Sequence, residues 1–228
     1  MLGFRRRPLF QSGICGNLHF RLILKDFDWI LGDLNKALGF STRSLVINEE
    51  LDHKIGIGNS LGEISLIYWS KGSYEKALNF VTRALEIQQE IGDKYNMTYN
   101  LGHKGVIYFS KGEYEKAEEY LEQSLIIQRK IKKNKDISLI CTTYLFLCFK
   151  KLGKEYDLKK IQFLIRKNVN TEYNTHYRIY QLLEDTTYLQ TAYSQVQEKA
   201  ENLEPNVKTK FLDYPIPKAI VEEWVNIN

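Results

Sequence analysis

The sequence predicts an all-α fold, a solenoid of stacked helix-turn-helix repeats closed by a C-terminal helical cap. The first observation is a repeat: KGSYEKALNFVTRALEIQQEI, which begins at Lys71, returns forty residues later as KGEYEKAEEYLEQSLIIQRKI. A fixed period of this size indicates a repeat array. The second observation is an apolar stripe at helical spacing within each copy. The third is that no proline lies between Pro8 and Pro205, which is typical of long helices joined by short turns.

The N-terminal stretch is the least regular part of the chain. Residues 1–17 show no periodic pattern and are expected to form an irregular lead, with the repeat array over residues 18–170. We expect a helix from Asn17 to Ile30, either as a modified end cap or as a segment outside the repeat. The RRRPLF stretch resembles the start of an export signal, but polar residues interrupt the segment after it. With only three cysteines, an odd number, the chain is expected to be a reduced, cytoplasmic protein.

From Leu31 the repeat is regular. Each second helix carries apolar residues spaced i, i+3, i+4 and i+7, so one of its faces is expected to be buried. Each first helix has a small residue, Ser65 or Gly105, where a close helix crossing requires one. It is expected to end at a glycine in a left-handed cap position. The glycine and the following lysine–alanine pair recur at a spacing of forty, at Gly32, Lys36 and Ala37, at Gly72, Lys76 and Ala77, and at Gly112, Lys116 and Ala117.

The turn between the two helices resembles the tetratricopeptide repeat. The residues that carry the resemblance are Gly105, Tyr108, Gly112, Tyr114 and Ala117, and in the preceding copy Ser65, Tyr68, Gly72, Tyr74 and Ala77. The resemblance covers Leu31 to Gly153 and implies a right-handed α-solenoid that binds proteins or peptides. The period of forty exceeds the usual ~34, which resembles the longer repeats of bacterial signalling proteins. A HEAT-type array is the structural alternative.

The regular pattern ends before the C-terminus. We expect a further first helix over residues 136–151 and a degraded second helix over residues 155–167. Residues 171–228 are expected to form a helical capping region, broken at residues 202–205 and at Pro215–Pro217. A solenoid needs such a cap because its last repeat otherwise exposes an apolar face.

No pattern in the chain predicts catalysis or a cofactor. The four histidines, His19, His53, His103 and His176, stand at unrelated repeat positions, and none has metal-ligand spacing to a cysteine or to another histidine. Phosphate-binding loops, nucleophile elbows and dinucleotide fingerprints are absent from the sequence. We therefore expect no enzyme, no metal and no cofactor. No run approaches the ~20 apolar residues of a membrane span.

An aromatic row recurs at one position of the first helices, at Trp69, Phe109 and Phe149, spaced by forty, with Trp29 in line before it. The resemblance implies that this position faces the concave groove, together with Leu66, Val106 and Phe146 three residues earlier. These six residues are the predicted protein-binding groove. The alternative is that the aromatic side chains pack against the neighbouring repeat.

Positive charge is concentrated in one part of the chain. Twelve basic and three acidic residues lie between Arg129 and Lys167, a net charge of +9 within a chain of net charge +4. If the helices there are antiparallel, seven residues gather on a basic edge: Arg129, Lys130, Lys132, Lys133, Lys135, Arg166 and Lys167. Such an edge attracts an acidic peptide or a nucleic acid backbone, and an ordinary solvated surface is the alternative.

Two functions are consistent with these observations. The first is a protein- or peptide-binding scaffold or adaptor that uses the concave groove. The second is a regulatory or sensory subunit of a bacterial signalling system, acting by self-association as a homo-oligomer or through a separate effector protein. A protein or peptide is the expected partner; nucleic acid is the less favoured one, and no membrane is expected.

Overall fold

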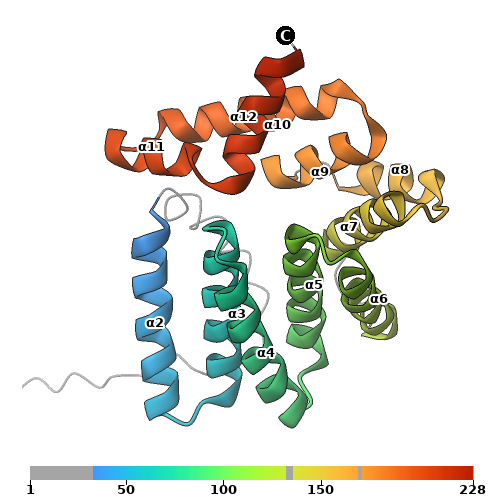
Figure 1. Ribbon diagram of the computed structural model, residues 1–228. Helices are drawn as coiled ribbons and strands as arrows, with labels where there is room; N and C mark the ends of the chain where they lie inside the picture. The colour runs from blue at the N-terminus through green and yellow to red at the C-terminus, as the bar shows by residue number, and fades with distance from the viewer. Residues whose placement is uncertain (1–32, 132–135, 169–170, 228) are drawn as a thin grey trace, which may run out of the picture.

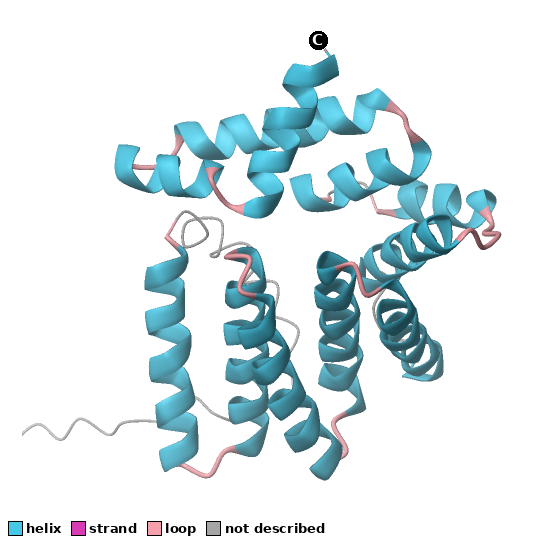
Figure 2. Cartoon of the chain, viewed as in Figure 1, coloured by secondary structure: helices cyan, strands magenta, loops and turns pink. Residues whose placement is uncertain are grey.

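Helices joined by short turns make up the described part of the chain. The computed structural model describes residues 33–131, 136–168 and 171–227. Across these ranges no strand occurs (Figure 2). The predictions for residues 1–30, among them the lead, the first helix and Trp29, lie outside them. The helices are α2 (Leu34–Glu50), α3 (Lys54–Ser70), α4 (Tyr74–Glu90), α5 (Lys94–Lys111), α6 (Tyr114–Ile131), α7 (Asp136–Leu152), α8 (Leu158–Lys167), α9 (Tyr173–Leu183), α10 (Thr186–Glu201), α11 (Pro205–Leu212) and α12 (Pro215–Ile227).

Helices α2 to α8 form the repeat array, in which consecutive helices pack side by side (Figure 1). Four of the described helices begin at an aspartate whose carboxylate accepts hydrogen bonds from backbone N–H groups of the first turn: Asp33, Asp93, Asp157 and Asp185. These side chains satisfy donors that would otherwise have no partner. The first helices of the pairs, α3, α5 and α7, are each followed by a glycine with positive φ, namely Gly72 (74°), Gly112 (80°) and Gly153 (69°). The predicted left-handed caps at Gly72 and Gly112 are confirmed.

The turns divide the array into two edges. The upper edge carries residues 71–73 and 112–113, where α3 and α5 end, and it lies at the top of the array in Figure 1. The lower edge carries residues 51–53 and 91–93, where α2 and α4 end. Helix α7 holds Cys141 and Cys148, which are both buried and are not joined by a disulfide.

The close crossing between the helices of a pair is made by a small residue, as predicted. Ser65 is buried and its hydroxyl donates a hydrogen bond to the carbonyl oxygen of Ala77, 2.8 Å away. At the equivalent position of the next pair, a Cβ built on Gly105 would stand 2.6 Å from Cγ of Leu121. The residue forty positions before Leu121 is the smaller Val81. Each crossing therefore combines one smaller and one larger residue in a complementary way.

We expect Gly105→Ser to destabilise the chain by about 1–2 kcal/mol, because overpacking at Leu121 outweighs the removal of a helical glycine. Leu121→Val alone removes one buried methylene at a cost of about 1 kcal/mol. The double variant recreates the Ser65 and Val81 pair, so it should lose less than the sum of the two. Urea denaturation of all four proteins measures this coupling, and strictly additive losses would show that the two positions do not share the crossing.

Helices α9 to α12 form a C-terminal unit, Tyr173–Ile227, with an apolar core of its own. That core is built from buried residues of α9 to α12: Tyr177, Leu189, Ala192, Val196, Ala200, Phe211 and Ile220. Figure 1 shows these helices lying across the upper edge of the array, from α2 to α7. The predicted cap is therefore placed along the array as well as after its last repeat, an arrangement that the sequence did not predict.

Candidate protein-binding surface

The six residues of the predicted groove lie in the last two turns of α3, α5 and α7, beside the upper edge. Leu66 and Phe149 are partly exposed. The other four are buried, with exposed fractions of 9% for Trp69, 7% for Val106, 8% for Phe109 and 4% for Phe146. In this conformation the six residues do not line an open groove. The burial favours the packing alternative, and the binding of a partner at these residues stays a prediction.

Phe109 takes part in the contact between the array and the C-terminal unit. Its ring meets Tyr144 of α7 edge-on, with ring centroids 5.1 Å apart. The guanidinium of Arg178, from α9, lies 5.5 Å from the centroid of the Phe109 ring. Arg178 also donates a hydrogen bond from Nε to the Tyr144 hydroxyl, at 3.2 Å. An arginine so placed combines a cation–π contact with a directed hydrogen bond, which fixes where α9 sits on the array.

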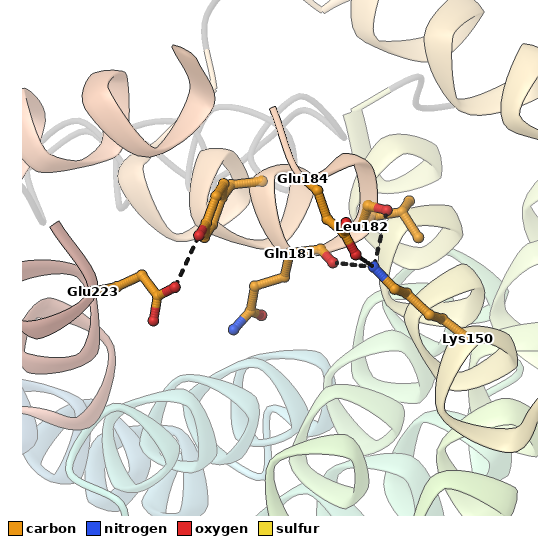
Figure 3. Close-up of polar contacts among 6 residues, drawn as sticks. Lys150, Gln181, Leu182, Glu184 and Glu223 are labelled. Atoms are coloured by element: carbon orange, nitrogen blue, oxygen red, sulfur yellow. Dashed lines mark hydrogen bonds and ion pairs between the residues drawn. The ribbon is translucent and has the colours of Figure 1, made fainter. Parts of the chain in front are cut away.

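Lys150 holds the carboxyl end of α9 (Figure 3). Its ammonium Nζ lies 3.0 Å from the carbonyl oxygen of Gln181 and 2.6 Å from Oε1 of Glu184, the residue that ends α9. A cation at a helix C-terminus is favourable because the last carbonyls there have no helical partner. The hydroxyl of Tyr180, also in α9, donates to Oε1 of Glu223 in α12 at 2.8 Å, which ties the C-terminal unit together.

At the other end of the edge, the turn before α12 contacts the first described repeat. Tyr214 packs against an apolar cluster of Leu34, Ala37 and Ile67. Burial raises the pKa of the Tyr214 hydroxyl, the carboxylate of Asp33 raises it further, and a hydrogen bond with the backbone of Leu34 opposes both. Cγ of Pro215 lies 3.1 Å from the position that a Cβ on Gly72 would take. The C-terminal unit therefore reaches from α7 to α2 and bridges the whole upper edge.

Comparison with known proteins identifies the repeats. The family model described as "Tetratricopeptide repeat" matches residues 59–91 and 99–130. Both segments are tetratricopeptide repeats. They span most of α3 to α6 and contain the motif residues on which the resemblance depends, so the tetratricopeptide prediction is confirmed for these two segments. The longer bacterial type of repeat stays a prediction. Tetratricopeptide repeats generally mediate protein–protein interactions and are usually non-catalytic, and the comparison identifies no catalytic domain.

Solved structures with tetratricopeptide-like repeats share the fold. One is the crystal structure of the Podosopora anserina "kinesin light chain nearly identical TPR-like repeats", at 15% identity and a TM-score of 0.50, which covers 93% of this chain and 98% of that one. A single-substitution variant of it also matches, at 15% identity and a TM-score of 0.50, and covers 95% of this chain and 100% of that one. These matches confirm the all-helical repeat fold. No curated protein matches the sequence.

Metal-binding groups and membrane-spanning helices can be looked for in the described repeat array and C-terminal unit. Across residues 33–131, 136–168 and 171–227, no group of three or more histidine, cysteine or acidic side chains could hold a metal ion. Within the same ranges no helix is both long and apolar enough to cross a bilayer. His53 stands before α3 with its Nδ1 3.1 Å from Oδ1 of Asn48. His103 lies within α5, and Nε2 of His176 is hydrogen-bonded to Thr171 at 2.9 Å.

Acidification from pH 7 to about 4.5 is expected to lower the free energy of unfolding, because two histidines are held neutral in the folded chain. Burial lowers the pKa of His103 to about 4 and also lowers that of His176. A group with a lowered folded pKa stabilises the fold above its unfolded pKa of about 6.5, and the contribution disappears as the pH falls through the folded value. For His103 the complete loss is about 3 kcal/mol.

Urea denaturation at several pH values measures this loss, and His103→Gln should flatten the pH dependence in that window. The carboxyl pKa values of Glu113 and Glu184 lie below their usual range because lysines pair with them, so their stabilisation is lost only at lower pH. If wild type and His103→Gln lose stability in parallel, the imidazole is in contact with water.

The predicted basic edge is only partly within the described residues. Arg129 and Lys130 are exposed in the last turn of α6, and Arg166 and Lys167 are exposed in the last turn of α8. Lys132, Lys133 and Lys135 lie outside the described residues. Cations in these last turns complement the helix dipoles. That the seven residues act as one binding edge stays a prediction.

Sequence reasoning missed Lys150, Arg178 and Tyr214, the residues that join the C-terminal unit to the array. For Lys150 an indication was available, since the equivalent residues of the two preceding first helices are Ser70 and Ser110. A lysine that replaces serine at one repeat position suggests a contact special to that repeat. Arg178 and Tyr214 lie beyond the repeats, where no periodicity marks them.

Proposed function

We propose that this chain is a protein-binding adaptor whose recognition surface is the upper edge of the array, with the six residues of the predicted groove at its centre. The observation that carries the proposal is that this edge already packs against helices, those of the chain's own C-terminal unit. Aromatic rings at Phe109 and Tyr144 and the cation of Lys150 supply an apolar surface with directed polar contacts. Aromatic and cationic anchors of this kind carry much of the binding energy at protein interfaces.

Access to this surface requires the C-terminal unit to move. The core of the unit supports its movement away from the edge as a folded body. Some of the polar contacts that hold it are also exposed: the Lys150 and Glu184 side chains keep exposed fractions of 33% and 78%. Ion pairs at such exposure contribute at most about 1 kcal/mol. A partner that binds only the open form then shifts the population by its preference for that form.

The test compares capture of proteins from a native lysate by three forms of the full chain. Glu184→Ala combined with Arg178→Ala loosens the C-terminal unit and leaves Lys150 on the array intact. Glu201→Ala combined with Lys210→Ala changes two exposed charges elsewhere as the control. The loosened form should capture at least about ten times more of the same partner, which corresponds to ~1.4 kcal/mol. A synthetic α9 peptide, Tyr173–Leu183, should compete for the surface. Capture that is indifferent to loosening and to the peptide would contradict the proposal.

A second candidate function is a regulatory subunit that works by self-association. The specific observation in its favour is the separate core of the C-terminal unit, because contacts made within one chain can be exchanged between two identical chains. Light scattering over a range of protein concentrations tests this candidate. The loosened variant should form more dimer than the wild type, and a monomer at all concentrations would exclude exchange.

A further inference from the structure

A pocket opens at the lower edge, opposite the C-terminal unit. It lies where α4 ends, α5 begins and α6 ends, and its volume is about 410 Å³. It is lined by Gln89, Gly92, Lys94, Met97, Ile127, Lys130 and Ile131. Ligand pockets usually occupy about 300–1,000 Å³, so this one has room for a large apolar side chain together with its neighbours.

The pocket combines an apolar lining with positive charge. Met97, Ile127 and Ile131 supply the apolar surface, while the exposed Lys94 and Lys130 supply two ammonium groups. Among the described residues neither lysine forms an ion pair. Nearby acidic groups are already engaged, since Glu90 pairs with Lys54 and Asp93 accepts hydrogen bonds from Asn96. Within the described residues, both ammonium groups at the pocket are therefore available to pair with a carboxylate of another molecule.

The equivalent positions of the preceding repeat, where α3 begins and α4 ends, carry opposite charges. Lys54 and Glu90, which lie forty residues before Lys94 and Lys130, form an ion pair there. At the pocket the acidic member is replaced by Lys130, so two cations stand where the preceding junction has a cation and an anion. A carboxylate from another molecule, placed between Lys94 and Lys130, would restore the missing charge complement.

We propose that this pocket is a second recognition site, which binds an acidic protein segment carrying a large apolar side chain. The apolar side chain occupies the surface of Met97, Ile127 and Ile131, and a neighbouring carboxylate lies between Lys94 and Lys130. A nucleic acid fits the pocket less well, because bases stack on aromatic side chains and the lining here is aliphatic. The site does not depend on opening of the upper edge.

Fluorescence polarisation with a labelled peptide, Asp-Glu-Asp-Leu-Phe-Glu-Asp-Glu, tests the proposal on the full chain. Lys130→Glu recreates the charge pair of the preceding junction, so it should weaken binding at least about tenfold. Ile127→Ser removes part of the apolar surface and should also weaken binding. Lys210→Glu, the same charge reversal on exposed α11, is the matched control and should leave affinity within about twofold.

Reversal of both lysines sharpens the test. Lys94→Glu combined with Lys130→Glu should reject the acidic peptide and accept the same peptide with lysines in place of its acidic residues. The proposal is overturned by the absence of saturable binding at about 1 mM peptide. It is also overturned by an equal loss in Lys210→Glu, or by a single-stranded oligonucleotide that displaces the peptide and binds more tightly. Because the pocket and the C-terminal unit lie on opposite edges, failure here leaves the proposed function of the upper edge unaffected.

Discussion

Deletion of residues 171–228 is expected to abolish cooperative unfolding and to cause aggregation. The deletion removes Arg178 and Leu182 from the surface of α5 and α7, and Tyr214 from the cluster of α2 and α3. Apolar side chains of the upper edge, with Phe109 among them, then face water as a continuous patch. Patches of this kind drive association, and an array without its cap loses the interface that its end repeats need.

Size-exclusion chromatography with light scattering and a thermal melt measure both effects. The matched control removes only residues 225–228, where Val225 and Ile227 are already exposed, and should melt as the full chain does. A truncated chain that stays monomeric and melts sharply would show that the array and the C-terminal unit are independent modules.

Phe109→Ala and Trp69→Ala are each expected to lower the free energy of unfolding by about 3–5 kcal/mol, the usual cost of truncating a buried aromatic residue. Phe109 loses its edge-on contacts with Tyr114 and Tyr144 and its contact with the Arg178 guanidinium. Trp69 loses its packing and the hydrogen bond that Nε1 donates to Ser110 Oγ at 2.9 Å. Since typical domains have only 5–15 kcal/mol in total, either loss is a large part of the stability.

Phe163→Ala is the matched control, because that ring is 55% exposed and its removal should change stability by less than about 1 kcal/mol. Denaturant midpoints of the three variants give the comparison. If the Phe109 and Trp69 variants behave like the Phe163 variant, the two aromatic side chains are not buried in solution. The aromatic row would then be accessible to a partner without movement of the C-terminal unit.

The repeats could be predicted from the sequence because their determinants are local and repeated. Gly72 and Gly112 follow helical stretches and recur at a fixed spacing, so the left-handed turn could be inferred at both places from its chemistry. Gly105 could be predicted to lie at a close crossing because its neighbours form an apolar stripe. Its match with Leu121, larger than Val81 of the preceding pair, also follows from the spacing of forty.

The covering of the upper edge could not be predicted in this way. It depends on contacts between residues far apart in sequence, such as Tyr214 with Leu34 or Arg178 with Phe109, and nothing in the local pattern of either partner specifies the other. The aromatic row was correctly placed on the first helices, but Trp69 and Phe109 pack against the neighbouring repeat, and Phe109 also contacts Arg178 from outside the repeats. Tertiary contacts of this kind override what a periodic pattern implies about exposure.

The charge pattern at the lower edge was within reach of sequence reasoning. Glu90 and Lys130 stand at equivalent positions and have opposite charge, a difference that a residue-by-residue comparison of the two repeats reveals. The predicted basic edge included Lys130 but grouped it with the lysines after Ile131 and with the end of α8, and it did not include Lys94. Which of the basic residues adjoin an apolar pocket could be seen only from the folded arrangement of α4, α5 and α6.

The C-terminal unit contacts α2 through Tyr214 and α7 through its bond to Lys150, and this bridge changes the mechanics of the molecule. In an array whose repeats contact only their neighbours, the distance between the end repeats can change, and either end can unfold locally. Here a second connection fixes the distance between the first described repeat and the last. The span of the array is then set by the length of the C-terminal unit, and the chain responds to force as a closed frame. Loss of the Tyr214 contact or of the Lys150 contact would allow the array to stretch again.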